Sequence, residues 1–378
     1  MNKLTPIKNV ASFKNGFAFK SNKYTSEGIR IIRISNVQDG KIIDKNPKFY
    51  PENSTKEYSE YLLKDGDLLM SLTGDVGRVG FIKNELLPAY LNQRVVKIEC
   101  DERVILKKYM YYFFKSPEIY QKIITMSKGV AQLNVSASDI FNLQIPVPSL
   151  QEQEKIVERL DKVFENIDTK INQKITLNNQ YKKYINSYIE KELFQEKNPV
   201  KLKDLINVKR KNINNYSNKF IGLENIVSNT SEVVNVESMA VKSNTYKFDK
   251  GSLLYGRLRP YLNKVTIVDF DGHCSTEIFP IDTTKELNIK YLKYFLMTQK
   301  TVNKINLQTT GARMPRASVS VLENLKIDLK SQKEQSINVE IFDNLTTLVQ
   351  NIVKVNLKII ENCKLLKKSI LNKEFSYE

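Results

Sequence analysis

The sequence predicts an α+β protein in which two mixed α/β domains are joined by two long antiparallel helices, as a tandem repeat with pseudo-twofold symmetry. Three observations lead to this fold class: two long stretches with helical spacing, an internal repeat, and a basic charge confined to the segments outside those stretches. The expected boundaries are residues 1–151 for the first domain, 152–197 for the first helix, 198–331 for the second domain and 332–378 for the second helix.

The first long helix is predicted from Glu152 to Gln195, because apolar residues recur there mostly in steps of three and four and the stretch contains neither Gly nor Pro. The second is predicted from Glu334 to about Asn372, where the apolar residues from Ile341 onward follow a heptad pattern. An apolar stripe this narrow does not bury a helix by itself, so we expect the two helices to cover one another.

The chain repeats itself at a shift of 182 residues. The run Lys108–Phe114 matches Lys290–Leu296 at this shift, and Glu152-Gln153 matches Glu334-Gln335. Because each domain joins its helix in the same way and the linker after the first helix is short, we expect one domain at each end of an antiparallel helix pair.

Each domain is expected to combine strands and helices. Each domain also contains one predicted shorter helix, Leu106–Thr125 in the first half and Ile289–Ile305 in the second, and the aromatic residues of these two helices are expected in the core. Short apolar or alternating runs bounded by Gly, Asn and Asp predict the strands. The predicted strands are Ile29–Ile34, Asp67–Leu72, Val79–Ile82 and Val95–Ile98 in the first half and Ser252–Tyr255, Val265–Val268 and Glu277–Ile281 in the second, with helices over Leu106–Thr125 and Ile289–Ile305.

The net charge of +17 is unevenly distributed. Residues 1–151 carry 22 basic and 15 acidic side chains, and residues 198–330 carry 21 and 12, whereas the two helical stretches are neutral to within one charge. A proteome rich in Lys and Asn is an alternative source of basic charge, but the neutral helices argue against a uniform bias. The pattern therefore indicates two polyanion-binding modules joined by a neutral spacer.

The cysteine content and the lack of long apolar segments indicate the cellular compartment in which the protein is expected. Cys100, Cys274 and Cys363 are far apart and odd in number, which favours a reducing cytoplasm over a disulfide framework. No stretch approaches the roughly 20 apolar residues of a membrane span, and the first residues lack the apolar core of a signal peptide. We expect a cytoplasmic protein without a membrane partner.

Motifs for catalysis are absent from the sequence. It contains no phosphate-binding Gly-x-x-x-x-Gly-Lys-Ser/Thr loop, and the sole histidine, His273 beside Cys274, is expected to be structural. The Gly-rich run Gly74–Gly80 lacks the dinucleotide-binding spacing and is expected to be a tight turn between two strands. These observations predict a binding protein without a metal or a cofactor.

Basic loops punctuated by Gly or Pro are the candidate binding elements. They are Leu253–Lys264 and Thr309–Arg316 in the second half, and Thr73–Arg78 and Ser127–Asn134 at the corresponding places in the first. Arg forms bidentate contacts with phosphate or guanine, and Asn or Gln can read adenine. The alternative is that an arginine such as Arg259 or Arg316 pairs with a nearby carboxylate.

Three runs resemble those of specificity subunits of type I DNA restriction-modification systems: Leu254–Lys264, Cys274–Glu277 and Gln144–Gln153. The resemblance covers the full length in the order recognition domain, helix, recognition domain, helix. It implies a non-catalytic subunit that selects a split double-stranded DNA sequence, one half per domain. One departure is that the junction Asp328–Gln332 lacks the Pro-x-Pro present at Pro146 and Pro148, so the start of the second helix is expected to be less sharply defined.

The resemblance also implies partners. In that family two adenine-methyltransferase subunits dock on the helices and motor-nuclease restriction subunits join them, so S-adenosylmethionine and ATP belong to the partners. The candidate partner-binding residues are Ile156, Leu160, Ile167, Ile171, Ile341, Leu345, Leu348 and Ile352.

Base reading is expected where the two halves match least, in Lys14–Tyr61 and Lys209–Lys247, because family members with different targets share Arg257, Arg259 and Pro260. A stand-alone DNA-binding regulator that dimerises through its helices and a divergent nuclease or methyltransferase are the alternatives. The candidate DNA-binding residues are Lys14, Lys20, Arg33, Arg78, Arg94, Lys128, Gln132, Asn134, Lys209, Arg210, Lys211, Arg257, Arg259, Lys264, Arg313 and Arg316.

Overall fold

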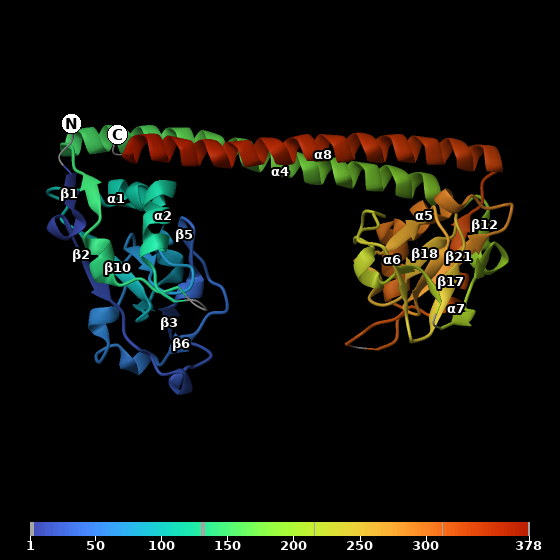
Figure 1. Cartoon of the computed structure of the whole chain (residues 1–378), viewed down its shortest axis with the longest axis horizontal. Coiled ribbons are helices and arrows are strands. Elements are labelled where there is room, and N and C mark those ends of the chain that lie inside the picture. The colour runs from blue at the N-terminus through green and yellow to red at the C-terminus, as the bar shows by residue number, and fades with distance from the viewer. Residues whose placement is uncertain (1–3, 130–132, 215, 312, 377–378) are drawn as a thin grey trace. The chain divides into compact units, whose positions relative to one another are not determined.

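The computed structural model describes residues 4–129, 133–214, 216–311 and 313–376, and the chain divides into two compact units. Unit 1 comprises residues 1–173 and 358–378, and unit 2 comprises residues 174–357. Each of the two long helices contributes one part to each unit (Figure 1).

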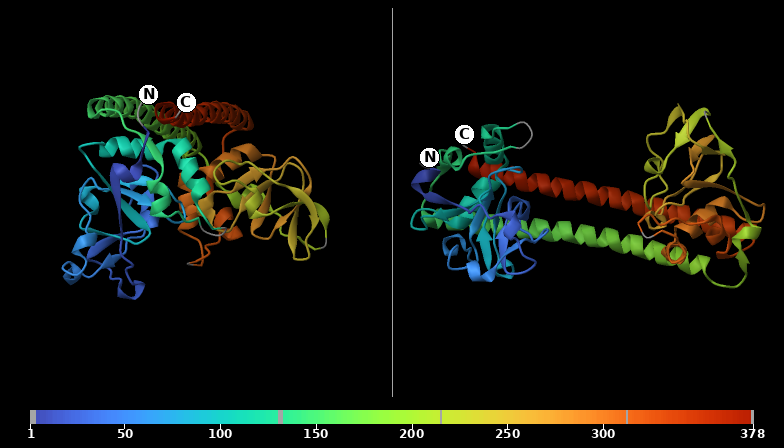
Figure 2. Two further views of the ribbon diagram at one scale, coloured as in Figure 1. Left: turned by 60° about the vertical axis from the view of Figure 1, so that its left-hand side comes forward. Right: turned by 90° about the horizontal axis from the view of Figure 1, so that it is seen from below.

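The long helices α4 (Leu150–Leu193) and α8 (Gln332–Phe375) are uninterrupted over 44 residues each (Figure 2). In unit 1, Arg159 of α4 forms an ion pair with Glu374 of α8, and Asp168, further along α4, pairs with Lys367 at 2.6 Å. The order of the partners is reversed, so the helices run antiparallel, as predicted.

The face of α8 that meets α4 in unit 2 lies one residue away from the predicted stripe. Phe342 and Asn356 of α8 are buried; the Phe342 ring centroid is 6.3 Å from that of Tyr188, and the Asn356 amide donates to Asn178 at 2.7 Å. Leu348 of the predicted stripe is instead 56% exposed. The predicted stripe of α8 is therefore buried only in part, since Ile341, Leu345 and Ile352 are half-buried. The fully buried face includes a polar asparagine that an apolar pattern does not reveal.

The described globular part of unit 1 contains three α-helices and two main sheets, with the order β2-β10-β7-β8 in one and β6-β3-β9 in the other. Two further sheets, β1-β11 and β4-β5, have two strands each. Figure 1 shows α1 between the long helices and the strands, with β3 and β6 at the end of the unit away from α4. All four strands predicted in this half are present. The strands are β1 (Leu4–Pro6), β2 (Ala11–Asn15), β3 (Ile29–Ile32), β4 (Val37–Gln38), β5 (Lys41–Ile42), β6 (Phe49–Tyr50), β7 (Leu68–Ser71), β8 (Val79–Phe81), β9 (Ala89–Leu91), β10 (Val95–Cys100) and β11 (Gln144–Pro146).

Unit 2 repeats the first sheet as β13-β21-β18-β19, and its second sheet is larger, with the order β14-β17-β20-β15-β16. The three strands predicted in this half are β18, β19 and β21. The strands are β12 (Pro199–Lys201), β13 (Ile206–Val208), β14 (Asn212–Ile213), β15 (Ser217–Ile221), β16 (Glu237–Ala240), β17 (Thr245–Phe248), β18 (Leu253–Gly256), β19 (Val265–Ile267), β20 (Gly272–Ser275), β21 (Ile278–Thr283) and β22 (Lys326–Asp328).

Each helix predicted inside a domain is two helices in the structure. In unit 1 they are α1 (Lys107–Lys115) and α2 (Pro117–Met126), followed by α3 (Ala137–Phe141), and in unit 2 they are α5 (Ile289–Met297) and α6 (Gln299–Asn306), followed by α7 (Val319–Glu323). Pro117 occupies the first turn of α2, where its missing N–H costs nothing. Thr298 interrupts the second pair, and its side chain accepts a hydrogen bond from the Thr301 N–H as the N-cap of α6.

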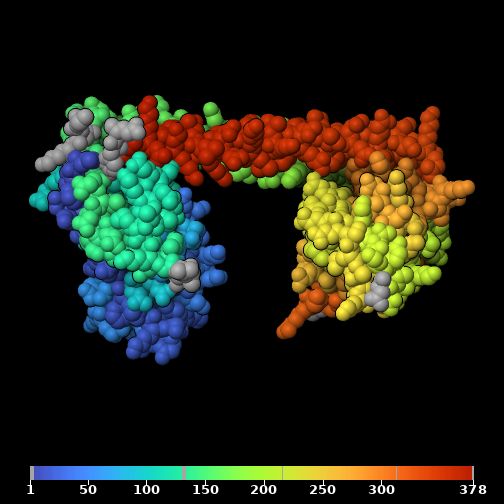
Figure 3. Space-filling model, in the orientation of Figure 1, coloured from blue at the N-terminus to red at the C-terminus, as the bar shows by residue number. Residues whose placement is uncertain are grey.

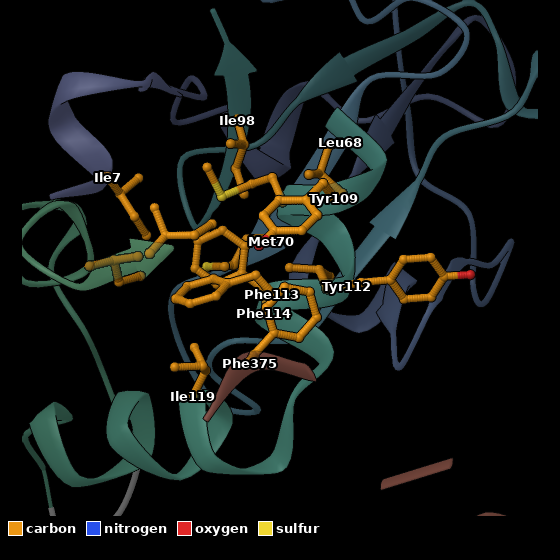
Figure 4. Close-up of a cluster of buried hydrophobic side chains, with 14 of the residues drawn as sticks. Ile7, Leu68, Met70, Ile98, Tyr109, Tyr112, Phe113, Phe114, Ile119 and Phe375 are labelled. Atoms are coloured by element: carbon orange, nitrogen blue, oxygen red, sulfur yellow. The ribbon is translucent and has the colours of Figure 1, made fainter. Parts of the chain in front are cut away.

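The core of unit 1 includes the end of α8 (Figure 4). Phe375 is fully buried, and its ring centroid lies 5.2 Å from that of Tyr109 and 5.8 Å from that of Phe113. Burial of a side chain of this size stabilises the unit by about 1.5–3 kcal/mol. In unit 2, Leu193 at the end of α4 is buried in the same way.

The repeated Glu-Gln pair marks the start of each long helix. Gln153 is fully buried; its amide accepts from the Leu106 N–H at 2.9 Å and donates to two backbone carbonyls. Gln335 makes the same three hydrogen bonds in unit 2, with the N–H of Asn288 as donor at 2.7 Å. The start of α8 is therefore held as firmly as that of α4, which corrects the expectation drawn from its missing prolines.

Candidate nucleic-acid interface

The predicted basic loops of unit 2 meet through their backbones. The loop after β18 (residues 257–264) and the loop between α6 and α7 (residues 307–316) are joined by a β-bridge between Leu258 and Arg316. A second bridge joins Arg316 to Thr310. We name these two segments the unit 2 loop pair.

Unit 1 brings its two predicted loops together in the same way. Asn134 bridges both Thr73, in the loop after β7 (residues 72–78), and Lys128, in the loop between α2 and α3 (residues 127–134). The described residues of these segments are the unit 1 loop pair. Residues 72–78 connect the antiparallel strands β7 and β8, as predicted for a tight turn.

Three of the predicted DNA-binding residues of the unit 2 loop pair have partners inside the protein. The Arg316 Nε donates to both oxygens of Glu277 at 3.0 and 3.1 Å, and this carboxylate raises the pKa of the guanidinium above its ordinary value. Arg257 lies over the Phe279 ring, 4.8 Å from its centroid, with its Nε buried and without a hydrogen bond. Lys264 donates to a backbone carbonyl at 2.5 Å. Arg316 therefore pairs with a carboxylate, which was the alternative to DNA binding, whereas Arg257 and Lys264 contact a ring and a backbone carbonyl.

Two arginines of the unit 2 loop pair remain available to an anion. Arg259 and Arg313 are exposed and have no side-chain partner among the described residues. Arg259 adopts a left-handed backbone conformation with φ 51°, which is uncommon for a residue other than glycine and indicates that the surrounding loop constrains it.

In unit 1, Arg78 also has an internal partner, because its guanidinium contacts Asp75 at 2.8 Å and donates to Gln38 at 3.3 Å. Asn134 accepts a hydrogen bond from the Thr73 hydroxyl at 3.0 Å.

Arg94 and Lys128 are the exposed cations at the unit 1 loop pair, and neither has a side-chain partner among the described residues. Gln132, predicted to bind DNA, lies outside the described residues.

The two loop pairs differ at one equivalent position. The Arg94 carbonyl accepts from the Leu72 N–H at 3.1 Å, and the Glu277 carbonyl accepts from the Arg257 N–H at 2.9 Å, so Arg94 and Glu277 occupy the same place in the two units. In unit 2 this place holds the carboxylate that neutralises Arg316, whereas in unit 1 it holds an uncompensated guanidinium.

In the part of unit 1 expected to read bases, Lys20 is exposed, whereas Lys14 lies half-buried in β2. Arg33 donates to the Asn46 carbonyl at 2.5 Å, and its Nε is buried without a hydrogen bond. Of these three residues, only Lys20 has a side chain that is exposed.

In the corresponding part of unit 2, Lys209 forms ion pairs with Asp282 and with Asp249, the latter at 2.6 Å. Burial lowers the pKa of Lys209, but the two carboxylates outweigh that effect and raise it above its ordinary value. Arg210 and Lys211 are exposed, so this pair is available to DNA and Lys209 is held by the fold.

The candidate partner-binding residues separate into two groups. Ile156, Leu160 and Ile167 of α4 are buried inside the chain and offer no surface to another protein. Leu348 of α8 is exposed, and the other candidates, one on α4 and three on α8, are half-buried. The half-buried candidates are Ile171, Ile341, Leu345 and Ile352.

Several surface features could not be found from the sequence. Leu307 and Met314 of the unit 2 loop pair are 88% and 44% exposed, and the Lys219 ammonium lies 4.2 Å from the centroid of the Phe270 ring. The sequence placed these residues in or near a predicted basic loop or the predicted base-reading segment, but it did not indicate that their side chains are exposed or in contact.

Within the described part of the chain, no group of three or more His, Cys, Asp or Glu side chains is arranged to hold a metal ion. His273 is fully buried; its Nδ1 forms a hydrogen bond with the Thr245 hydroxyl and its Nε2 contacts two backbone carbonyls. This histidine is structural, as predicted. No helix among the described residues has both the length and the apolarity to cross a membrane.

The family model for the type I restriction modification DNA specificity domain matches residues 2–177 and 195–362. This match covers most of the chain, which therefore belongs to that family of DNA specificity domains.

Individual relatives agree. The chain is 28% identical over 184 residues to the type I restriction enzyme MjaVIII specificity subunit of Methanocaldococcus jannaschii, a match over 48% of this chain and 43% of the relative. It is 23% identical over 319 residues to the EcoDI specificity subunit of Escherichia coli, over 73% of this chain and 71% of the relative. The match thus spans less than half of the MjaVIII subunit.

Two solved structures share the fold. A chain from a structure of the complex assembly and conformational transition of the type I R-M system has a TM-score of 0.75 at 14% identity, over 98% of this chain and 96% of that chain. The crystal structure of the HsdS subunit from Thermoanaerobacter tengcongensis has a TM-score of 0.55 at 14% identity, over 99% and 96%. At this identity the likeness concerns the fold alone.

Proposed function

We propose that this chain is a sequence-specific DNA-binding subunit of a type I restriction-modification complex, in which each half reads one half of a split DNA target. The observation that carries the proposal is the duplicated loop pair. Two equivalent constellations, one in each unit, present exposed cations (Arg94 and Lys128, Arg259 and Arg313) on a basic domain. Such cations suit phosphate contacts that position a protein on DNA without reading its sequence.

Base reading belongs, in this proposal, to the parts of residues 1–151 and 198–331 that differ between the units. The second sheet has three strands in unit 1 and five in unit 2, so the two surfaces present different side chains to a groove. Lys20 in unit 1 and Arg210 and Lys211 in unit 2 are the exposed candidates among the residues predicted to read bases.

A methyltransferase subunit is proposed to dock on the exposed apolar stripe of α8 in unit 2. Ile337, Leu348 and Val355 are 47%, 56% and 58% exposed and lie on one face of the helix, at helical spacing. An apolar face of this kind on a helix is typical of a protein interface. Catalysis, S-adenosylmethionine, ATP and the motor-nuclease subunits belong to the partners, and the assembly acts in the cytoplasm.

The docking proposal has a direct test. The double variant L348S/V355S is expected to keep its thermal stability and to lose most of its affinity for the methyltransferase subunit in a pull-down with purified components. N351S, which changes an exposed polar residue of the same helix, is the matched control. Equal binding by both variants would exclude the stripe as the docking surface.

The function itself is tested by mapping methylated adenines in strains with and without this gene. We expect one bipartite methylation motif to disappear with the gene. Replacement of residues 198–331 by the matching segment of another such subunit should then change one half of the motif and preserve the other. A methylome that does not depend on the gene would refute the proposed function.

A further inference from the structure

The unit 2 loop pair carries apolar side chains as well as cations. Of the five exposed large apolar residues in the globular part of unit 2, as far as the structure describes it, three lie on this loop pair: Tyr261 at 51%, Leu307 at 88% and Met314 at 44% exposure. The segment between α6 and α7 projects from the surface of unit 2 in the space-filling view (Figure 3). Exposed apolar groups concentrated on a projecting loop indicate a binding function.

The backbone around these residues is constrained by specific contacts. The Arg259 N–H donates to the Pro315 carbonyl at 2.7 Å, and the Asn263 amide donates to the Met297 carbonyl at 2.9 Å. Gly311 has a φ of +94°, and a Cβ there would lie 3.1 Å from the Met314 carbonyl oxygen. The ion pair between Arg316 and Glu277 holds the other end of the loop.

The charges beside these side chains suit DNA better than a protein partner. Arg259 and Arg313 lie on the same two loops, are exposed and lack side-chain partners among the described residues. Proteins that bend DNA insert apolar side chains such as Leu and Met between base pairs from the minor groove, while neighbouring cations contact the backbone.

From this combination we propose that the exposed side chains of Leu307 and Met314, which we name the wedge, enter the minor groove and partly unstack base pairs in the half-site of unit 2. Arg259 and Arg313 contact the flanking phosphates. The inference rests on the proposed function and extends it to a deformation of the DNA.

The wedge would make that half-site prefer a deformable step, such as a pyrimidine–purine step, without a hydrogen bond to either base. In the aligned positions of the repeat, unit 1 has Thr125 in place of Leu307 and Gln132 in place of Met314. The proposal therefore concerns the half-site of unit 2.

The test uses the full chain and a duplex that carries the target mapped by methylation, with 2-aminopurine placed at each step of the unit 2 half-site in turn. For the wild type we expect strongly raised fluorescence at one or two positions, which reports unstacking. L307S and M314S should each lower the signal at the position that the substituted side chain enters, and the double variant should bind the duplex roughly tenfold more weakly. L366S, which changes a leucine of α8 that is 52% exposed and lies outside the proposed DNA-binding segments, should behave as the wild type.

The outcomes separate the two proposals. Wild-type binding to the target without a raised signal at any position, or unchanged signals in L307S and M314S, would overturn the wedge and leave the proposed function intact. If no methylated target depends on the gene, the proposed function fails and the wedge fails with it. Unchanged thermal melting of the variants confirms that a lost signal does not result from unfolding.

Discussion

Arg316 illustrates, at the scale of single residues, how a cation in a basic loop is withdrawn from the surface. Glu277 accepts two hydrogen bonds from its guanidinium, and the equivalent position in unit 1 is occupied by Arg94. Because one carboxylate replaces one guanidinium, the loop pairs differ in local charge by two at this place. The net charge of a domain therefore overstates the number of cationic side chains that its loops have available for phosphate contacts.

Removal of the Glu277 charge should free Arg316 for DNA. In E277Q we expect tighter binding of a nonspecific duplex at low salt, because a phosphate can replace the lost carboxylate. The plot of log affinity against log salt should become steeper by about 0.9, the value of one additional phosphate contact. Fluorescence titration of a labelled duplex at several salt concentrations measures both quantities.

The matched control for this experiment is E361Q, which removes an exposed carboxylate of α8 that has no partner among the described residues and lies outside the proposed DNA-binding segments. A slope that changes equally in both variants would mean that overall charge, and not Arg316, determines the effect.

The buried glutamines at the starts of the long helices are a second test at this scale. Q335A leaves the Asn288 N–H and two carbonyls without partners in a buried place, and we expect it to destabilise unit 2 by roughly 3 kcal/mol. Q332A, which removes one exposed hydrogen bond, should cost less than about 1 kcal/mol. Hydrogen exchange of the unit 2 amides measures the difference, and equal losses would contradict the structural role of Gln335.

At the scale of elements, the contact between the first helix of each domain and its long helix is the same in the two units. The Tyr112 hydroxyl of α1 donates to Asp161 of α4 at 2.5 Å, and the Tyr294 hydroxyl of α5 donates to Asp343 of α8 at 2.6 Å. Burial raises the pKa of Asp343, but hydrogen bonds from Tyr294 and Lys290 outweigh it and leave the pKa below its ordinary value.

This depressed pKa predicts a pH dependence. The ionised Asp343 stabilises the folded state above the unfolded pKa of about 3.9, and the contribution is lost as the pH falls through the lower folded value. We expect D343N to be about 1–2 kcal/mol less stable at neutral pH and to approach the wild type under strongly acidic conditions. Denaturation followed at several pH values tests this, with E340Q, an exposed carboxylate of α8, as the control. A stability difference that does not change with pH would mean that the Asp343 charge is not involved.

At the scale of the whole molecule, α4 and α8 each extend through both units, so their length is expected to set the gap between the two half-sites. One heptad inserted at mid-length in both helices keeps the faces in register. It adds about 10 Å, or roughly three base pairs at about 3.4 Å each. Those base pairs also turn the duplex by roughly 100°, given about 10.5 pairs per turn, so DNA deformation should lower activity.

Where methylation survives this insertion, the expected target has unchanged half-sites and a gap longer by about three base pairs. Mapping of methylated adenines in a strain with the insertion decides the question. Surviving sites with the original gap would show that the helices do not set the spacing.

The sequence by itself determined those features that depend on local periodicity. The spacing of Ile156, Leu160 and Ile167 identified α4 and its buried face within unit 1, and the shift of 182 residues identified the duplication. Helical and strand periods are properties of neighbouring residues, and a repeated sequence folds in a repeated way, so no knowledge of distant contacts was needed.

Only the tertiary structure decided which candidates are available to a ligand. Whether Arg316 faces DNA or Glu277 depends on a residue 39 positions away, and the face of α8 that meets α4 depends on Asn356 finding Asn178. The exposure of Leu307 and Met314 likewise follows from loop contacts. Pairing and burial depend on side chains that are distant in sequence. The local pattern of one sequence does not show which of these side chains come into contact.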